Sequence, residues 1–182
     1  MATFKEQMNT VFDTLKGQFS YSNVMQSPKV EKVVVSVGTG KIDDKQKIAL
    51  IQDRLGKITG QKVAPRPARL SIASFKLREG DIIGYQVTLR GERMRHFLDK
   101  LIHIALPQTR DFRGIKPTSI DEMGNITIGI KEHTIFPETA DEELKDVFGF
   151  AITIVTSAKT PAEAEALLRH LGLPLQKVEA EA

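Results

Sequence analysis

The sequence contains no cysteine, no tryptophan and no long apolar run. Without cysteine there are no disulfides, thiolate nucleophiles or thiolate metal ligands, and this composition is typical of proteins in a reducing compartment. No apolar run approaches the roughly 20 residues that a membrane-spanning helix requires. The first twenty residues carry lysines and acids among their apolar positions, unlike a signal peptide. We therefore expect a cytoplasmic protein with no membrane contact.

Catalytic and metal-binding patterns are also missing. No histidine is spaced with a second ligand as zinc sites require, and no nucleophile, base and acid can be assembled from spacing. The segment "VSVGTGK" is similar to a phosphate loop, but Val35 and Ile42 stand where a Walker loop has glycine and serine or threonine. We predict no metal, no cofactor and no enzymatic activity. The main alternative is a small enzyme that holds a phosphorylated ligand at residues 38–41.

Charge is distributed unevenly along the chain, although the net charge is only +3. Residues 62–116 carry twelve lysines and arginines against five acids, whereas residues 117–182 carry five against twelve. A basic middle indicates an anionic partner, and an acidic C-terminal third suggests a face that avoids nucleic acid or meets a basic protein. An unevenly charged solvated surface and a protein–protein adaptor are the alternatives.

Helical periodicity and cap residues predict four helices in a single domain, residues 1–182. Three helices are expected at residues 3–18, 44–58 and 91–105, the last ending near Pro107. A fourth begins at the N-cap Thr160, with a reciprocal capping box to Glu163, and ends at Gly172. The tail from about residue 175 to 182 is expected to be flexible.

Four segments alternate at the period of two that is typical of strands, residues 29–38, 81–91, 125–131 and 149–159. One face of each is apolar. The opposite faces carry small, hydroxyl-bearing or cationic residues: Lys32, Val34, Ser36, Gln86, Thr88, Arg90, Asn125, Thr127, Lys131, Ala151, Thr153 and Ser157. We predict a two-layer α+β fold, RRM-like, with an antiparallel sheet, helices on one face and a projecting basic loop at about residues 64–80.

The polar strand faces contain three cations and no acid, which suits contacts to phosphate and ribose. They also contain no aromatic residue, which argues against base stacking on single-stranded RNA and favours a folded RNA. The ordinary wet side of an antiparallel sheet is the alternative. A row of basic residues on the third helix has two interpretations, a solvated helix face or a face that contacts phosphates. Its members are Arg93, His96, Lys100 and His103.

Long blocks of the sequence resemble the bacterial large-subunit ribosomal protein L five family. They are "SPKVEKVVVSVGTG", "ITGQKVAPRPARLSIASFKLREG", "GYQVTLRGERMRHFLDKLIHIALPQTRDFRG", "GNITIGIKEHTIFPE" and "IVTSAKTPAEAEALLRHLGLP", in order over nearly all of residues 20–175. The resemblance implies a structural protein of the ribosome that is not an enzyme. Such a protein binds 5S rRNA and large-subunit rRNA in the central protuberance, with its open sheet face toward the RNA.

The resemblance also implies the residues that contact RNA. Ser36, Gln61 and Thr88 correspond to contact positions of the family. Many members have asparagine at the position of Ser36. Serine keeps a hydrogen-bond donor and an acceptor but has a shorter side chain, which suits a water-bridged contact. The remaining residues expected to bind rRNA are Lys32, Lys62, Gln86 and Arg90.

The basic loop is implied to approach the elbow of peptidyl-site tRNA. The residues expected to make this contact are Arg66, Arg69, Ser71, Lys76 and Arg78. The family further implies an intersubunit bridge to small-subunit head protein thirteen and contacts with other central-protuberance proteins. Residues 111–114 and 138–146 are the candidates for the bridge.

Overall fold

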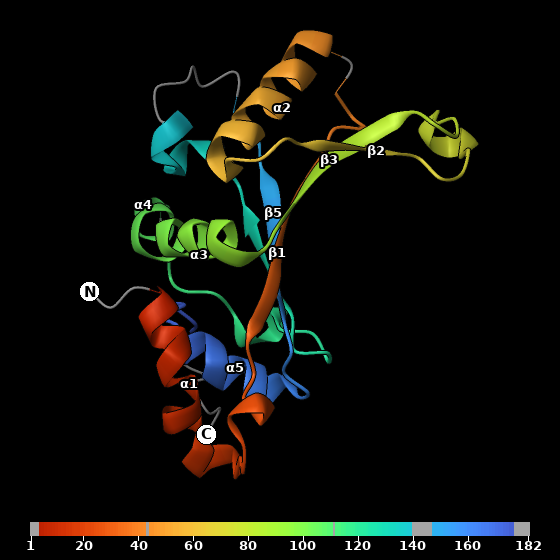
Figure 1. Ribbon diagram of the computed structural model, residues 1–182. Helices are drawn as coiled ribbons and strands as arrows, with labels where there is room; N and C mark the ends of the chain where they lie inside the picture. The colour runs from red at the N-terminus through yellow and green to blue at the C-terminus, as the bar shows by residue number, and fades with distance from the viewer. Residues whose placement is uncertain (1–3, 43, 111, 140–146, 177–182) are drawn as a thin grey trace, which may run out of the picture. The chain divides into compact units, whose positions relative to one another are not determined.

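The structure is a computed structural model that describes residues 4–42, 44–110, 112–139 and 147–176 (Figure 1). The chain divides into two compact units. The first contains residues 1–33, 90–128 and 153–182, and the second contains residues 34–89 and 129–152. Because the chain divides into two units, the single domain stays a prediction. Three strands each contribute residues to both units.

Five strands form one antiparallel sheet in the order β2-β3-β1-β5-β4. The strands are β1 Val30–Gly38, β2 Ala64–Pro67, β3 Ile82–Leu89, β4 Ile126–Ile130 and β5 Phe150–Thr156. The α+β class and the antiparallel sheet are confirmed. Strand β2 was not predicted. It occupies the start of the expected loop and pairs with β3, so the sheet extends into that segment.

In the second unit, helix α2 (Lys45–Thr59) packs its apolar side against the strands. Ile51, Leu55 and Ile58 are almost fully buried, as are Val35 of β1 and Val87 of β3. The helix begins where the Asp44 side chain accepts the backbone N–H of Gln46 at 2.8 Å. It ends at Gly60, whose φ of 63° lies in the left-handed region that glycine tolerates.

In the first unit, helix α1 (Phe4–Phe19) contacts both α3 (Gly91–Lys100) and α5 (Pro161–His170). The third helix ends near Pro107, as predicted. From α3 it passes through a π-helical turn, Leu101–Ala105, into the short helix α4, Leu106–Gln108. The wider turn, in which Leu106 N–H donates to the Leu101 carbonyl, permits a proline at position 107 without a clash against the preceding turn.

The predicted capping box of α5 forms only in part. Thr160 caps the helix, because its hydroxyl accepts the backbone N–H of Glu163 at 3.3 Å. The Glu163 carboxylate does not return to Thr160. It accepts the backbone N–H of Lys159 at 2.7 Å and the hydroxyl of Tyr21. Both Tyr21 and Glu163 are buried, so the carboxylate satisfies a distant buried donor and joins the start of α5 to the segment after α1.

Alkaline pH is expected to weaken this contact. Burial, together with the hydrogen bond to Glu163, raises the pKa of Tyr21 above its ordinary value of 10.0. The unfolded chain therefore loses the phenolic proton first, so the stabilisation is complete below pH 10 and is lost as pH rises toward the folded-state pKa. Above pH 10 the loss should approach about 1.4 kcal/mol per pH unit.

The check is urea unfolding of the wild type and Tyr21→Phe at pH 8, 10 and 11. The variant should be less stable at pH 8, because Glu163 loses a donor. The stability difference between the two proteins should shrink above pH 10, since the variant has no phenolic proton to lose. A difference that stays constant over this range contradicts the assignment.

Candidate nucleic-acid interface

The polar surface of the second unit is formed by the sides of β1 and β3 that face away from α2. Ser36, Gln86 and Thr88 are half-buried, and the residues that alternate with them are buried. The alternation that predicted this surface is therefore confirmed for both strands. Gln61, Lys62 and Arg66, from the segment that follows α2, lie at or next to residues bonded to β3. We call these three residues, together with Ser36, Gln86 and Thr88, the polar sheet surface.

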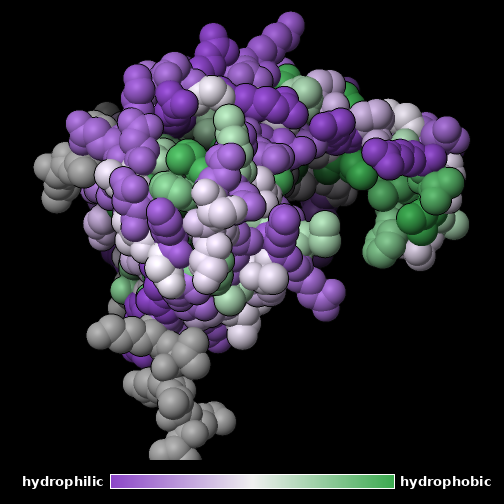
Figure 2. All heavy atoms as spheres, turned by 60° about the horizontal axis from the view of Figure 1, so that its bottom comes forward, coloured by the Kyte–Doolittle hydropathy of each residue, from purple (hydrophilic) through white to green (hydrophobic). Residues whose placement is uncertain are grey.

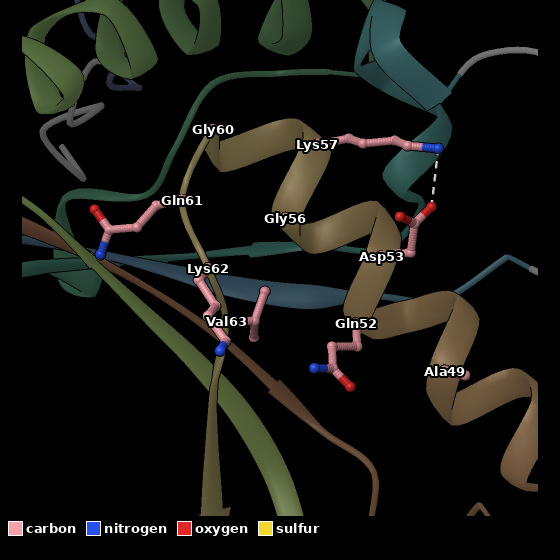
Figure 3. A pocket seen from close by; sticks show the side chains of 9 residues that line it. All are labelled: Ala49, Gln52, Asp53, Gly56, Lys57, Gly60, Gln61, Lys62 and Val63. Carbon is pink, nitrogen blue, oxygen red and sulfur yellow. Dashed lines mark ion pairs between the residues drawn. The ribbon is translucent and has the colours of Figure 1, made fainter.

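Gln61 reaches this surface from the end of helix α2. After the left-handed turn at Gly60, its side-chain amide donates to the main-chain carbonyl of Thr88 at 3.1 Å. Figure 3 shows the Gln61 side chain directed away from α2 toward the strands. The structure thus brings together two residues that lie 27 positions apart in the sequence and that were both expected to contact RNA.

A shallow depression of about 580 Å³ lies beside Gln61 (Figure 3). Ala49, Gln52, Asp53, Gly56, Lys57, Gly60, Gln61, Lys62 and Val63 line it. Its single acid, Asp53, pairs with Lys57 at 2.9 Å, and the hydrogen bond from Lys57 lowers the pKa of Asp53. Lys62 is exposed and makes no ion pair with a described residue. Lys62 therefore gives the depression its net positive charge.

Arg66 was expected in the loop, but it lies on strand β2. It stands opposite Gly84 of β3, and its Nε donates to the side-chain oxygen of Gln86 at 2.5 Å. The guanidinium is exposed and is positioned by the sheet. Lys32 and Arg90 belong to the other unit, so their place on the same surface stays a prediction.

The rest of the predicted loop is a hydrogen-bonded hairpin, residues 68–81. Ala68 pairs with Asp81 and Gly80 through backbone hydrogen bonds of 2.8 and 3.0 Å, and Ile72 forms a bridge with Leu77. The side chains of Ser71 and Asp81 accept the backbone N–H groups of Glu79 and Arg78. Ser71 and Asp81 therefore serve the hairpin's own backbone, while the side chains of Arg69, Lys76 and Arg78 stay exposed.

The hairpin also carries an apolar tip that the charge-based interpretation missed. Leu70 and Phe75 are 73% and 71% exposed, and Ile72 is 41% exposed. Figure 2 shows this apolar patch at the end of the hairpin, next to hydrophilic residues. A sequence signal existed, because Leu70 and Ile72 alternate with Ser71. Exposed large apolar side chains grouped in this way usually mark a contact surface.

The glycine-containing segment after β1 is not a phosphate loop. Thr39 N–H bonds the Ile83 carbonyl at 2.9 Å, and Ile42 N–H bonds the Thr39 carbonyl at 2.9 Å, so the segment forms a turn. The Asp44 carboxylate occupies the N-terminus of α2, where a bound phosphate would have to sit. The structure therefore disfavours the alternative of a phosphate-binding enzyme.

The part of the chain that the structure describes contains no group of three histidine, aspartate or glutamate side chains placed to hold a metal ion. No helix among the described residues is long and apolar enough to cross a bilayer. Of the bridge candidates and the predicted flexible tail, residues 111, 140–146 and 177–182 lie outside the described residues.

Two family models match the chain. The one described as ribosomal protein L5 matches residues 23–78, and the one that describes the C-terminus of the same ribosomal protein family matches residues 82–175. Proteins named large ribosomal subunit protein uL5 are similar over nearly their whole length. The Flavobacterium johnsoniae protein is 50% identical over 174 residues, 95% of both chains. The Trichlorobacter lovleyi protein is 48% identical over 178 residues, 97% of this chain and 99% of the relative.

Proposed function

We propose that the polar sheet surface of this chain, which belongs to the ribosomal protein L5 family, binds 5S rRNA. As a member of this family, the chain is a structural constituent of the bacterial large ribosomal subunit and not an enzyme. It works in the cytoplasm as part of the ribosome. The observation that carries the proposal is the hydrogen bond from Gln61 to the Thr88 carbonyl, which holds two candidate RNA contacts together.

The chemistry of the polar sheet surface supports RNA as its ligand. The Gln61 amide uses one N–H on Thr88, which leaves a second N–H and the carbonyl oxygen for a partner. The hydroxyls of Ser36 and Thr88 can both donate and accept, as recognition of a ribose 2′-hydroxyl requires. Lys62 and Arg66 supply positive charge for phosphates. None of the six residues of this surface is acidic or aromatic, which favours backbone and ribose contacts over base stacking.

Purification from cells tests the proposal. The tagged protein, isolated from the fraction that sediments more slowly than ribosomal subunits, should carry 5S rRNA as its main RNA. A variant with Gln61→Ala and Thr88→Ala should lose most of this RNA. If the wild type carried RNA without enrichment of 5S rRNA, the proposal would be wrong.

The proposal also includes further specific partners in the ribosome. They are large-subunit rRNA, peptidyl-site tRNA, small-subunit head protein thirteen and other central-protuberance proteins. The hairpin suits the tRNA contact because exposed Arg69, Lys76 and Arg78 accompany the apolar side chains of Leu70 and Phe75. Cations attract the phosphates, and flat apolar groups can pack against ribose or an exposed base.

Separate substitutions should distinguish the two surfaces. Arg69→Ala with Lys76→Ala should leave the affinity for 5S rRNA within about twofold, because neither residue lies on the polar sheet surface. The same variant should speed the release of peptidyl-site tRNA from assembled ribosomes several-fold, since it removes two phosphate contacts. Filter binding to purified RNA and to ribosomes measures both effects. Loss of 5S rRNA binding by this hairpin variant would contradict the division.

A further inference from the structure

Arg66 extends from a restrained piece of backbone. It lies on strand β2 between Pro65 and Pro67. Each proline ring fixes its own φ, and the residue before a proline is restricted to extended backbone. Pairing of β2 with β3 adds the restraint of the sheet. The exposed Arg66 side chain therefore starts from a backbone position that both the local sequence and the sheet hold in place.

The Arg66 side chain lies across strand β3. Arg66 stands opposite Gly84, and directly opposed residues of an antiparallel pair point to the same face of the sheet. Gln86 shares that face, because it is two positions from Gly84 on the same strand. Since Gly84 has no side chain, Arg66 can pass over it and reach Gln86. There the Arg66 Nε donates to the Gln86 side-chain oxygen at 2.5 Å.

The acceptor that holds Arg66 is a neutral amide, so the positive charge is positioned without being neutralised. Two other arginines are held by acids instead. Arg95 pairs with Glu92 at 2.5 Å, and Arg169 pairs with Glu165 at 2.8 Å. Beyond its Nε, the Arg66 guanidinium makes no hydrogen bond or ion pair with a described residue. Its two terminal amino groups are thus free to meet an anion.

We propose that Arg66, positioned by Gln86, binds one phosphate of 5S rRNA through both terminal amino groups of its guanidinium. The planar fork matches two phosphate oxygens, and ordering the side chain before the RNA arrives lowers the entropic cost of binding. This role rests on the proposed binding of 5S rRNA to the polar sheet surface. It moves Arg66 from the residues expected to contact tRNA to those that contact 5S rRNA, and it makes Gln86 a positioning residue.

Arg66→Lys separates the shape of the guanidinium from its charge. Filter binding of the full chain to 5S rRNA, at several salt concentrations, should show a dissociation constant raised about tenfold, because one charge-assisted hydrogen bond is lost. The log–log salt slope should stay unchanged, because lysine neutralises the same phosphate. A residue that acted through charge alone would tolerate lysine, so unchanged affinity in Arg66→Lys would overturn the proposal.

The matched control is Arg169→Lys. Arg169 is also exposed, and its Nε is also held by a side chain, that of Glu165 at 3.0 Å, but it is not part of the polar sheet surface. The control should change the affinity for 5S rRNA less than twofold. Urea unfolding checks that both variants are folded. An equal loss of affinity in the control would contradict the role of Arg66.

A second substitution tests the positioning role. Gln86→Met keeps the length of the side chain and removes the acceptor, so the dissociation constant should rise about fivefold, because the guanidinium must then be ordered on binding. In an Arg66→Lys background the same substitution should change affinity less than twofold, because Gln86 acts through the guanidinium. A merely structural loss at the edge of the sheet would persist in that background. Additive effects would therefore overturn the positioning role.

The wild type distinguishes failure of the proposed function from failure of this inference. If the wild type does not prefer 5S rRNA, the proposed function is wrong and the role of Arg66 is wrong with it. If the wild type binds 5S rRNA and Arg66→Lys binds equally well, only the role of Arg66 is wrong. Release of peptidyl-site tRNA from assembled ribosomes should change less than twofold in Arg66→Lys. A larger effect on tRNA than on 5S rRNA would overturn the proposal.

Discussion

Gly84→Ala is expected to lower the free energy of unfolding by about 3 kcal/mol, the upper end of what inserting one methyl into a packed site costs. A Cβ at this position would lie 2.6 Å from the Val37 carbonyl oxygen. The next nearest atoms are Val37 C and Gly38 Cα at 3.6 Å. All three belong to the backbone of β1, so no flexible side chain can move aside. The strands themselves would have to separate.

The position matters because β3 lies between β1 and β2 in the sheet. Gly84 faces β1 on one side and pairs with Arg66 of β2 on the other. Displacing β3 would therefore disturb both flanks of the polar sheet surface. A strand glycine here is explained by close backbone approach.

Gly129→Ala is the matched control. Gly129 also lies in a strand, but a Cβ there would meet no atom within 4 Å. Alanine at such a site should be neutral or slightly stabilising, by up to about 1 kcal/mol, because glycine loses more backbone entropy on folding. Urea unfolding of both variants measures the difference. Equal midpoints for Gly84→Ala and Gly129→Ala would show that the approach of β1 and β3 is looser than described.

Gln61→Ala combined with Thr88→Val is expected to weaken 5S rRNA binding about 100-fold. The estimate assigns about 1.4 kcal/mol, a factor of ten, to each lost hydrogen-bonding side chain. Valine keeps the shape of threonine without the hydroxyl, so the change in affinity reports the hydroxyl. Alanine at position 61 removes the amide that is expected to contact the RNA and also the group that donates to the Thr88 carbonyl. Isothermal titration with 5S rRNA measures the loss.

The control for this variant is Gln52→Ala. Gln52 is an exposed glutamine that lines the same depression from helix α2 (Figure 3). Its substitution should change the affinity less than twofold and should slightly favour the helix. If Gln52→Ala weakened binding as much as Gln61→Ala did, the RNA would lie along α2 and not on the strands. Arg90→Ala should also weaken binding, because Arg90 is expected to contact a phosphate.

The sequence was sufficient where local periodicity decides the structure. In β1 the residues from Val33 to Val37 alternate between buried and half-buried, as their pattern predicted. Thr160 caps α5 as expected, because the cap depends on residues three positions apart. Val30 departs from the alternation, because it is buried like Val33 although the two lie three positions apart. Such a shift depends on neighbouring elements, which a local pattern does not describe.

The features that could not be predicted depend on distant parts of the chain. Strand β2 has four exposed residues, two of them proline, and so lacks the pattern of a strand. It is an edge strand, where proline is tolerated because one row of N–H groups has no partner to lose. Likewise, the Glu163 carboxylate accepts a hydrogen bond from Tyr21, 142 residues away, and so does not complete the predicted capping box. The bonds from Gln61 to Thr88 and from Arg66 to Gln86 are also tertiary.

The central claim, that this protein recognises 5S rRNA, is tested most directly by a competition in a mobility-shift titration at two salt concentrations. The competitors are 5S rRNA and a random hairpin RNA of equal length. We expect a clear preference for 5S rRNA at both salt concentrations. The affinity should fall with salt by a log–log slope of roughly −0.7 to −0.9 per neutralised phosphate. Equal affinity for the two RNAs would contradict the claim.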